Sequence, residues 1–412
     1  MNLLFISRCW PTPLISGDRV LLYHLARELR ARGHTLDLLA FHLADEETPA
    51  DGPEGPFAAA QAILEKPRSS LDYLLRMPHL FPDSLRQCWN PAMWEAIERR
   101  LTGRPYDLVH FFGGVQVYEF RNLVAPRVPT IIVPYESYSL ALERAMARAP
   151  RFHGRLRLWG RRMIARRYEA AIYRGFGKVV LVTGSDQAHL RRHAVGLPTV
   201  VIPNGVSSEF FRPLPDGFET PSLAFVGNFA YPPNVEAALT LIRDVLPRVQ
   251  SEVPETRAVL IGAHPPRALT ALAASDVEVT GAVADIRPHV KRSACFVSAL
   301  VSGSGIRNKI LEAMAMGIPV AATSLSCEGI HATAEENVLL GETPQALADA
   351  ALRLLRDGSL WRRIAQGAQR LMRREHTWEG VAAQYEELYR SVIDETARSM
   401  GRQARQEVGS HV

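Results

Sequence analysis

Residues 302–312, SGSGIRNKILE, combine two glycines, two cations and a carboxylate in one short segment. Apolar residues with helical spacing follow, so the segment is predicted to be a loop that leads into a helix. Free N–H groups at a helix start attract anions, and Arg307 and Lys309 would oppose the helix dipole unless an anion were bound. The pattern therefore predicts a phosphate or diphosphate site. The alternative interpretation is a solvated ion pair between Lys309 and Glu312.

The elements that must position this loop alternate between strands and helices. In the first half, helical patterns separate the short apolar runs NLLFIS, TLDLLAFH, YDLVHFFG, TIIVPY and KVVLVTG. In the second half the alternation restarts with SLAFVG, AVLIG, VEVTG, CFVSAL and PVAAT. Such alternation predicts βαβ units with parallel sheets, in which ligands lie beyond the carboxyl ends of the strands.

The length of 412 residues and a proline-rich segment indicate two domains. We predict a first domain over 1–206, a linker over 207–222, a second domain over 223–375, a last helix over 376–395 and a disordered tail over 396–412. Segment 44–60 is acidic and then rich in proline, glycine and alanine, which predicts an exposed loop.

Several classes of protein are disfavoured by what the sequence lacks. No apolar run approaches the roughly 20 residues that cross a bilayer, and the start of the chain does not resemble a secretory signal. Four scattered cysteines fit a reducing cytosol and argue against structural zinc. The turn after the first strand lacks the G-x-G-x-x-G of NAD-dependent dehydrogenases.

The segment 151–174 carries eight arginines and no lysine. Two interpretations stay open for it: a solvated helix face, or a peripheral contact with an anionic membrane. Aromatic residues are not interleaved so as to stack bases, so we expect no nucleic-acid partner.

The segment around Glu312 resembles the donor-binding signature of the retaining GT-B glycosyltransferases of family four. Glu312 and the following AMAMGIPV (313–320) match the second half of a pattern that contains two glutamates. The first glutamate, which in the family holds a hydroxyl of the donor sugar, falls on Ser304 and is a departure from the pattern. The variant GSGIRNKILEA is similar to a subset of bacterial sugar transferases from surface-polysaccharide gene clusters.

Further matches extend the resemblance over most of the chain: SGDRVLLYHLARELRARGH (16–34), PNGV (203–206), LAFVGNFAYPPNVEAA (223–238), VTGAVADIRPHV (279–290) and HTWEG (376–380). The resemblance implies an α/β protein with two Rossmann-like doubly wound parallel-sheet domains facing a cleft (GT-B). The first domain would bind the acceptor and the second the nucleotide-sugar donor. The helix over 376–395 would cross back to the first domain.

The resemblance also implies a set of site residues. Those assigned to donor binding are Gly17, Arg19, Gly227, Asn228, Ser304, Gly305, Ile306, Arg307, Lys309 and Glu312. His110 and Glu136, at the ends of two predicted strands, are the catalytic candidates. Each has an alternative interpretation: His110 as a packed or surface histidine, and Glu136 as a residue that stabilises the first turn of a helix.

The activity implied is a metal-independent, retaining transfer of a hexose. The sugar would move from a nucleotide-diphosphate sugar to a glycan or lipid-linked acceptor in surface polysaccharide synthesis, with no cofactor. No histidine pair and no Asp-x-Asp suggests a metal site, so cations and helix N–H groups would stabilise the departing diphosphate in place of a metal ion. The expected location is the cytoplasm, at the inner face of the membrane. Ser304 keeps two alternatives open, a nucleotide-sugar epimerase-like enzyme and a non-catalytic nucleotide- or glycan-binding protein.

Overall fold

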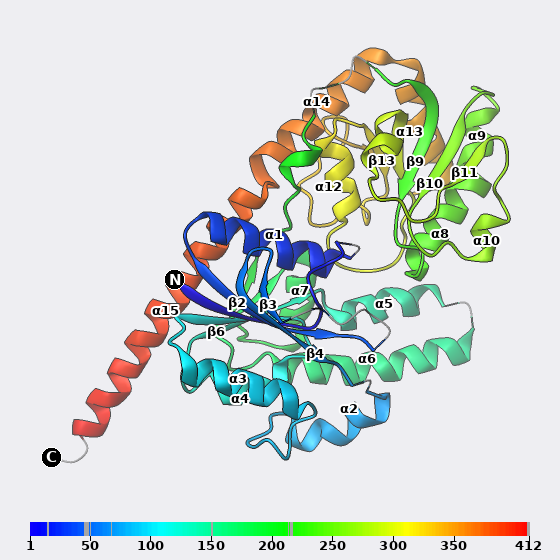
Figure 1. Cartoon of the computed structure of the whole chain (residues 1–412). Coiled ribbons are helices and arrows are strands. Elements are labelled where there is room, and N and C mark those ends of the chain that lie inside the picture. Colours follow the sequence, from blue (N-terminus) through cyan, green and yellow to red (C-terminus); the bar gives the residue numbers. More distant parts are fainter. Residues whose placement is uncertain are drawn as a thin grey trace. The chain divides into compact units, whose positions relative to one another are not determined.

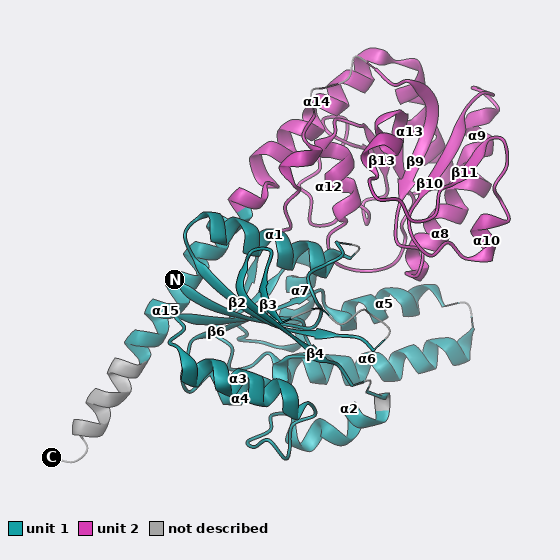
Figure 2. Ribbon diagram, viewed as in Figure 1, with its two compact units in different colours: residues 1–202, 381–412 teal, residues 203–380 magenta. Residues whose placement is uncertain are grey.

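The computed structural model of the chain forms two compact units, coloured separately in Figure 2. Unit 1 comprises Met1–Ile202 and Val381–Val412, and unit 2 comprises Pro203–Gly380. The structure describes residues 1–14, 16–44, 49, 51–66, 68–149, 151–212, 214 and 217–409. The segment 207–222, predicted as a linker, lies in unit 2, whose first strand begins at Thr220.

Unit 1 is built on a sheet that, within the described residues, has eight strands in the order β3-β4-β2-β1-β5-β6-β7-β8. The strands are β1 (Asn2–Ser7), β2 (Thr35–His42), β3 (Gly52–Glu54), β4 (Phe57–Leu64), β5 (Leu108–Phe112), β6 (Thr130–Tyr135), β7 (Lys178–Leu181) and β8 (Thr199–Val201). The helices are α1 (Gly17–Ala31), α2 (Ser70–Arg76), α3 (Pro91–Gly103), α4 (Arg121–Val124), α5 (Tyr138–Arg148), α6 (Phe152–Ile172), α7 (Gly184–His193) and most of α15 (Trp378–Gly409).

The strands of unit 1 are apolar because helices cover both faces of the sheet. Helices α1 and α3 lie on opposite faces, as Figure 1 shows, and β1 and β5 between them are almost wholly buried. Neighbouring strands pair in parallel, except for β3 with β4. The carboxyl ends of the parallel strands therefore share one edge of the sheet.

The prediction of an exposed loop over 44–60 is wrong where β3 and β4 form. Strand β4 pairs in parallel with β2, and Phe57, Ala60 and Ile63 are buried on the sheet. The alanine-rich composition of this segment concealed a strand, because alanine has little strand preference of its own and is accommodated here by packing. Residues 45–48 and 50 lie outside the described residues.

Unit 2 has a smaller sheet that, in the part of the chain the structure describes, contains six parallel strands in the order β11-β10-β9-β12-β13-β14. The strands are β9 (Thr220–Val226), β10 (Arg257–Ile261), β11 (Val277–Val279), β12 (Ser293–Ser298), β13 (Val320–Ala322) and β14 (Leu339–Leu340). The helices are α8 (Pro232–Thr240), α9 (Leu246–Gln250), α10 (Arg267–Thr270), α11 (Arg287–Lys291), α12 (Asn308–Ala315), α13 (Pro344–Arg356) and α14 (Gly358–Glu375). The prediction of two parallel-sheet α/β domains is confirmed.

Helix α15 packs on unit 1 through an apolar stripe that includes the buried Tyr385, Tyr389 and Val392. Its Glu386 accepts a hydrogen bond from Arg32 Nε at 2.7 Å. The helix continues to Gly409, whereas the sequence predicts a disordered tail from residue 396. The extension contains alanine, arginine, glutamine and glutamate, which all favour helix.

Candidate active site

The glycine-rich loop before α12 has a backbone that requires its glycines. Gly303 and Gly305 have φ angles of 98° and 76°, in the left-handed region that side chains disfavour. A Cβ atom at Gly303 would lie 2.6 Å from the Tyr231 hydroxyl, so the loop after β9 packs directly against this one. The two loops follow neighbouring strands, β9 and β12, at the carboxyl edge of the sheet.

Several amides of this loop and of the helix start are available to a ligand. Within the described residues, the N–H groups of Gly305, Ile306, Asn308 and Lys309 donate no main-chain hydrogen bond. Buried or half-buried N–H groups need an acceptor, and an anion at a helix N-terminus supplies one. This arrangement supports the predicted anion site.

Lys309 and Glu312 lie on one face of α12 and form an ion pair. Lys309 Nζ is 2.9 Å from one carboxylate oxygen of Glu312 and 2.8 Å from the other. Glu312 is only 7% exposed, while the Lys309 side chain is 37% exposed. A buried carboxylate needs such a partner, so Glu312 also holds the lysine ammonium at the head of the helix.

Arg307 and Ile306 are placed differently from Lys309. The Arg307 guanidinium turns back on its own loop, where Nη1 donates to the carbonyl oxygens of Ser304 and, at 3.0 Å, Gly305. It must leave these carbonyls to bind a phosphate. Ile306 packs against the core of unit 2 and offers a ligand its N–H group. Ser304 is buried beneath the loop.

The loop after β9 contributes Gly227 and Asn228. Gly227 is packed so closely that a Cβ atom at Gly262 would lie 1.9 Å from its carbonyl oxygen. Asn228 fixes the turn, since its side-chain oxygen accepts from Ala230 N at 3.0 Å and its carbonyl accepts from Asn234 Nδ2 at 2.8 Å. The backbone here is therefore held in place by its neighbours.

Asn204 is a residue of this region for which the sequence indicates only a turn. Its side chain is buried, and its Nδ2 donates to Asn308 Oδ1 at 2.9 Å. Asn308 is the first residue of α12, so this bond orients the start of the helix. The signal in the sequence was PNGV, whose asparagine is ordinarily interpreted as a turn residue.

In unit 1, charged side chains also gather at the start of α1, which begins at Gly17. Asp18 accepts from Arg8 Nε at 3.0 Å, and Arg19 donates through Nη1 to Thr12 O at 2.9 Å. Burial alone would raise the pKa of the Asp18 carboxyl, but Arg8 and the Ser16 hydroxyl outweigh it and hold that pKa below its usual value. Arg19 is buried, so its guanidinium serves the loop before α1.

His110 lies inside β5 and not at its end. It is fully buried, its ring centroid is 3.8 Å from that of Phe112, and its Nδ1 is 2.8 Å from the Tyr389 hydroxyl of α15. Burial holds its pKa well below the ordinary value, so the imidazole is neutral. This geometry is that of a packed core histidine, the alternative that the sequence left open.

Glu136 follows β6 at the carboxyl edge of the sheet and is half-buried. The preceding Tyr135 has a φ of 71°, a strained conformation of a kind that clusters at functional sites. The Arg8 guanidinium, which follows β1, lies 4.8 Å from the centre of the Tyr135 ring. Glu136 therefore follows a strand at the edge where a parallel sheet binds its ligands.

Sequence reasoning missed Glu65 and Arg8 at this same edge. Glu65 directly follows β4, and burial raises the pKa of its carboxyl although Arg68 and Arg8 oppose that rise. The residue was hidden because the segment before it was predicted to be a loop. Arg8 directly follows NLLFIS, and that position after a predicted strand was the available signal.

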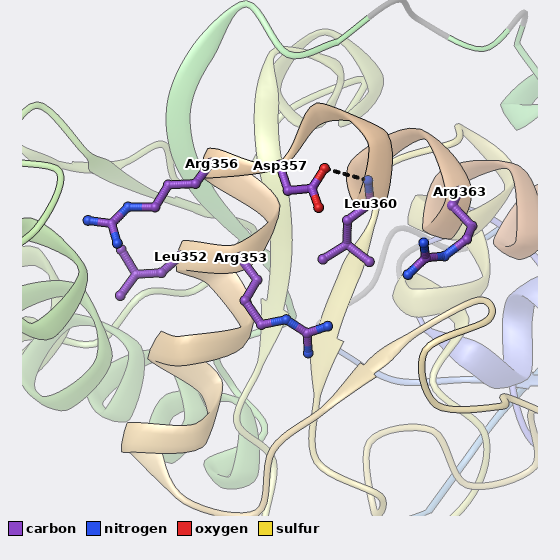
Figure 3. Close-up of a pocket in the computed structure, with 6 residues that line it drawn as sticks. All are labelled: Leu352, Arg353, Arg356, Asp357, Leu360 and Arg363. Atoms are coloured by element: carbon purple, nitrogen blue, oxygen red, sulfur yellow. Dashed lines mark hydrogen bonds between the residues drawn. The ribbon is translucent and has the colours of Figure 1, made fainter.

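A separate cavity of about 330 Å³ lies between α13 and α14 of unit 2, as Figure 3 shows. Three arginines line it, but Arg353 binds Glu335 at 2.7 Å and Arg356 binds Glu252 at 2.7 Å. Its lining includes no residue of the loops before α8 and α12. Because none of the residues of those two loops lines it, we assign the cavity no role in donor binding.

Among the described residues, no three His, Cys, Asp or Glu side chains gather as ligands of a metal would. No helix in the described part of the chain is long and apolar enough to cross a membrane.

Models of two known protein families match this chain. Residues 15–210 match the model of glycosyltransferase family 4, and residues 220–357 match that of the group 1 glycosyl transferases. Among curated protein sequences, none matches this chain. The two family matches follow one another along the chain and cover both units.

Solved structures are similar over nearly the whole chain. Sucrose-phosphate synthase from Thermosynechococcus elongatus aligns over 96% of this chain and 99% of its own, with a TM-score of 0.73 and 19% identity. HepE from Anabaena, in complex with UDP and glucose, aligns over 95% and 100%, with a TM-score of 0.64 and 18% identity. WaaG, a glycosyltransferase involved in lipopolysaccharide biosynthesis, aligns over 93% and 98%, with a TM-score of 0.63 and 17% identity.

These similarities define a protein of the GT-B fold, with two parallel-sheet α/β domains. The chain belongs to the family 4 (group 1) glycosyltransferases, and it is a glycosyltransferase.

Proposed function

We propose that this glycosyltransferase moves a hexose, with retention of anomeric configuration and without a metal ion, from a nucleotide-diphosphate sugar to a glycan or lipid-linked acceptor in surface polysaccharide synthesis. The observation that carries the proposal is the Lys309–Glu312 pair at the head of α12, beside a loop with available amides. Glu312 is also the residue on which the second glutamate of the family signature falls.

The donor diphosphate is proposed to bind across the start of α12. Its negative charge suits Lys309 and the amides of Gly305, Ile306 and Asn308, which donate no main-chain hydrogen bond within the described residues. Arg307 adds a second cation once it leaves the loop carbonyls. The HepE structure contains UDP and glucose, which makes a uridine diphosphate sugar the first donor to test.

Glu312 is proposed to change partners when the donor binds. In the free protein its carboxylate holds Lys309, and in the complex it would accept hydrogen bonds from the two ribose hydroxyls while the ammonium turns to the phosphates. Ser304 stands where the family has a glutamate that binds the donor sugar. A hydroxyl is a weaker acceptor than a carboxylate, so contact with the sugar would be weaker here.

Charge stabilisation carries the chemical step in this proposal. As the bond from sugar to diphosphate breaks, the cation and amides stabilise the growing negative charge, which such preorganised donors do well. The acceptor hydroxyl then attacks from the face that the diphosphate leaves, without a nucleophile from the protein. Glu136 is the proposed group that orients this hydroxyl or takes its proton. Buried His110 has no part in this step.

The acceptor is proposed to be a glycan, free or linked to a lipid. WaaG, which has the same fold, is involved in lipopolysaccharide biosynthesis, and this supports a glycan acceptor. The arginine-rich segment 151–174 contains the whole of α6, and we propose that it makes a peripheral contact with an anionic membrane at the cytoplasmic face.

A screen of nucleotide sugars for binding and hydrolysis tests the function and identifies the base and the sugar. Thermal stabilisation by one donor, followed by transfer to a glycan acceptor with the donor's anomeric configuration kept in the product, is the expected result. Anomeric configuration is measured by nuclear magnetic resonance, and activity should survive a chelator. Incubation with donor alone separates the alternatives: conversion to an epimeric sugar would replace the transferase proposal, and binding without turnover would indicate a non-catalytic protein.

A further inference from the structure

Helix α6 has two apolar faces, of which one is exposed. Ala165, Tyr168 and Ile172 are buried in unit 1. On the first half of the helix, Phe152, Leu156 and Trp159 are 75%, 55% and 51% exposed. At roughly 100° per residue the three exposed side chains fall on one narrow stripe, on the side of the helix opposite the buried residues.

Guanidinium groups share the exposed half of the helix with this stripe. By the same spacing Arg155 lies beside the stripe, and Arg151 and Arg157 are exposed within the same turns. Within the described residues, none of these three has a carboxylate partner, whereas Arg162 pairs with Glu143 of α5. Glu169 is the one acidic residue of 151–174, and it is buried against Ser137 and Ser139.

This combination has the chemistry of a helix that lies in a membrane interface. Exposed large apolar side chains on a helix with many arginines bind the boundary between lipid headgroups and acyl chains, and the arginines bind anionic headgroups. A solvated helix face would place charge, and not Phe152 and Trp159, at its most exposed positions. Electrostatic adsorption alone would not require the apolar stripe.

We propose that the first half of α6 inserts shallowly into an anionic bilayer, with Phe152, Leu156 and Trp159 reaching the acyl boundary and the flanking arginines on lipid phosphates. The inference deepens the proposed function, because it rests on an acceptor presented at a membrane and names the surface that meets the lipid. It predicts that two contributions to vesicle binding can be separated. The attraction of the arginines to anionic headgroups weakens as salt rises, and the burial of the apolar side chains does not.

Co-sedimentation of the full chain with phosphatidylcholine vesicles, with and without phosphatidylglycerol, tests the proposal. The wild type should bind only the anionic vesicles, weaken as salt rises, and keep a residual affinity at high salt. The double variant Leu156→Gln/Trp159→Gln should bind at least about tenfold more weakly, because apolar burial is lost. Val195→Gln is the matched control, since Val195 is 82% exposed in the same unit but lies outside α6.

A second readout reports insertion itself. Lipids brominated in the acyl chains should quench part of the tryptophan fluorescence of the wild type, and Trp159→Phe should remove that part while vesicle binding persists. All three substituted positions are exposed, and unchanged thermal unfolding verifies that the variants fold. The assay contains no nucleotide sugar, so donor binding, measured separately, shows whether the transferase proposal stands when this one fails.

Three results would overturn the inference. The first is equal vesicle binding by the double variant and the control. The second is the absence of binding by the wild type at low salt. The third is a wild-type dimer in light scattering that the double variant dissociates, which would assign the stripe to a second copy of this chain.

Discussion

Residues that the sequence predicts to be functional lie both at the start of α12 in unit 2 and in the middle of β5 in unit 1. Their surroundings in the structure differ. Lys309 and Glu312 lie within 2.9 Å of each other beside free amides, whereas His110 is enclosed between aromatic rings. A motif of contiguous residues carries its own geometry, because helical spacing alone places positions three apart on one face. A single residue in an apolar run has no such support.

The largest expected effect is on the α12 side of this comparison. Replacing Lys309 with alanine should reduce kcat/KM about 10²–10³-fold, because a cation next to a departing diphosphate stabilises the transition state. Glu312→Ala should weaken donor binding in the same assay. The matched control is Arg353→Ala, which breaks an exposed ion pair with Glu335 in the same unit. Equal loss in the control would show that the effect is structural.

The second-largest expected effect is on kcat, from a substitution at the carboxyl ends of the strands of unit 1. Glu136→Gln keeps the shape of the side chain but removes its charge, so kcat should fall about a hundredfold if the carboxylate assists the acceptor hydroxyl. The KM for the donor should change little, and steady-state kinetics with both substrates separates the two quantities. Unchanged kcat would assign Glu136 to the first turn of α5, the alternative that the sequence left open.

His110→Ala should act on stability and leave chemistry alone. Emptying this site leaves a cavity and removes the partner of the Tyr389 hydroxyl, so the free energy of unfolding in urea should fall by about 2–3 kcal/mol. Activity per folded molecule should persist. His331→Ala is the control, because its side chain is 83% exposed and its loss should cost under about 0.5 kcal/mol. A stable but inactive His110→Ala protein would restore a catalytic role.

The smallest effect is a difference in acid sensitivity between the units. Burial lowers the pKa of several histidines, namely His24, His34, His110 and His189 in unit 1 and His376 in unit 2, with His24 and His189 near 4. Below about pH 6.5 the unfolded chain binds protons that these folded sites do not, so stability falls as the pH drops toward 4. Glu65 and Glu119, whose pKa values burial raises, partly offset this in unit 1.

Hydrogen exchange, corrected for intrinsic rates, measures this difference between pH 7 and pH 5. We expect the opening free energy of core amides to fall by about 1 kcal/mol more in unit 1 than in unit 2. An equal fall in both units would mean that the buried histidines do not control the response.

The sequence predicts the parallel sheets and the α12 motif because both depend on local pattern. Alternating apolar runs specify strands and crossovers, and the glycines of 302–305 specify a loop backbone that Gly303 and Gly305 adopt. These features need little knowledge of distant contacts. The same holds for the ion pair of Lys309 with Glu312, which follows from helical spacing.

Other features depend on contacts between distant residues and were beyond the sequence. Strand β4 is alanine-rich and exists because β2 offers it an edge, which also brings Glu65 to the strand ends. The burial of His110 depends on Tyr389, which is 279 residues away. The Arg307 side chain bends back and donates hydrogen bonds to the carbonyl oxygens of Ser304 and Gly305 in its own loop. Helical spacing does not predict such a contact.

Calorimetric titration with uridine and guanosine diphosphates, run on the wild type, Lys309→Ala and Arg353→Ala, tests whether the diphosphate binds at the start of α12. We predict that one nucleotide binds the wild type and the control equally well, and binds Lys309→Ala at least about tenfold more weakly, since a charge-assisted contact is lost. Undiminished binding by Lys309→Ala would show that the diphosphate lies elsewhere, and the account of the α12 site would be contradicted.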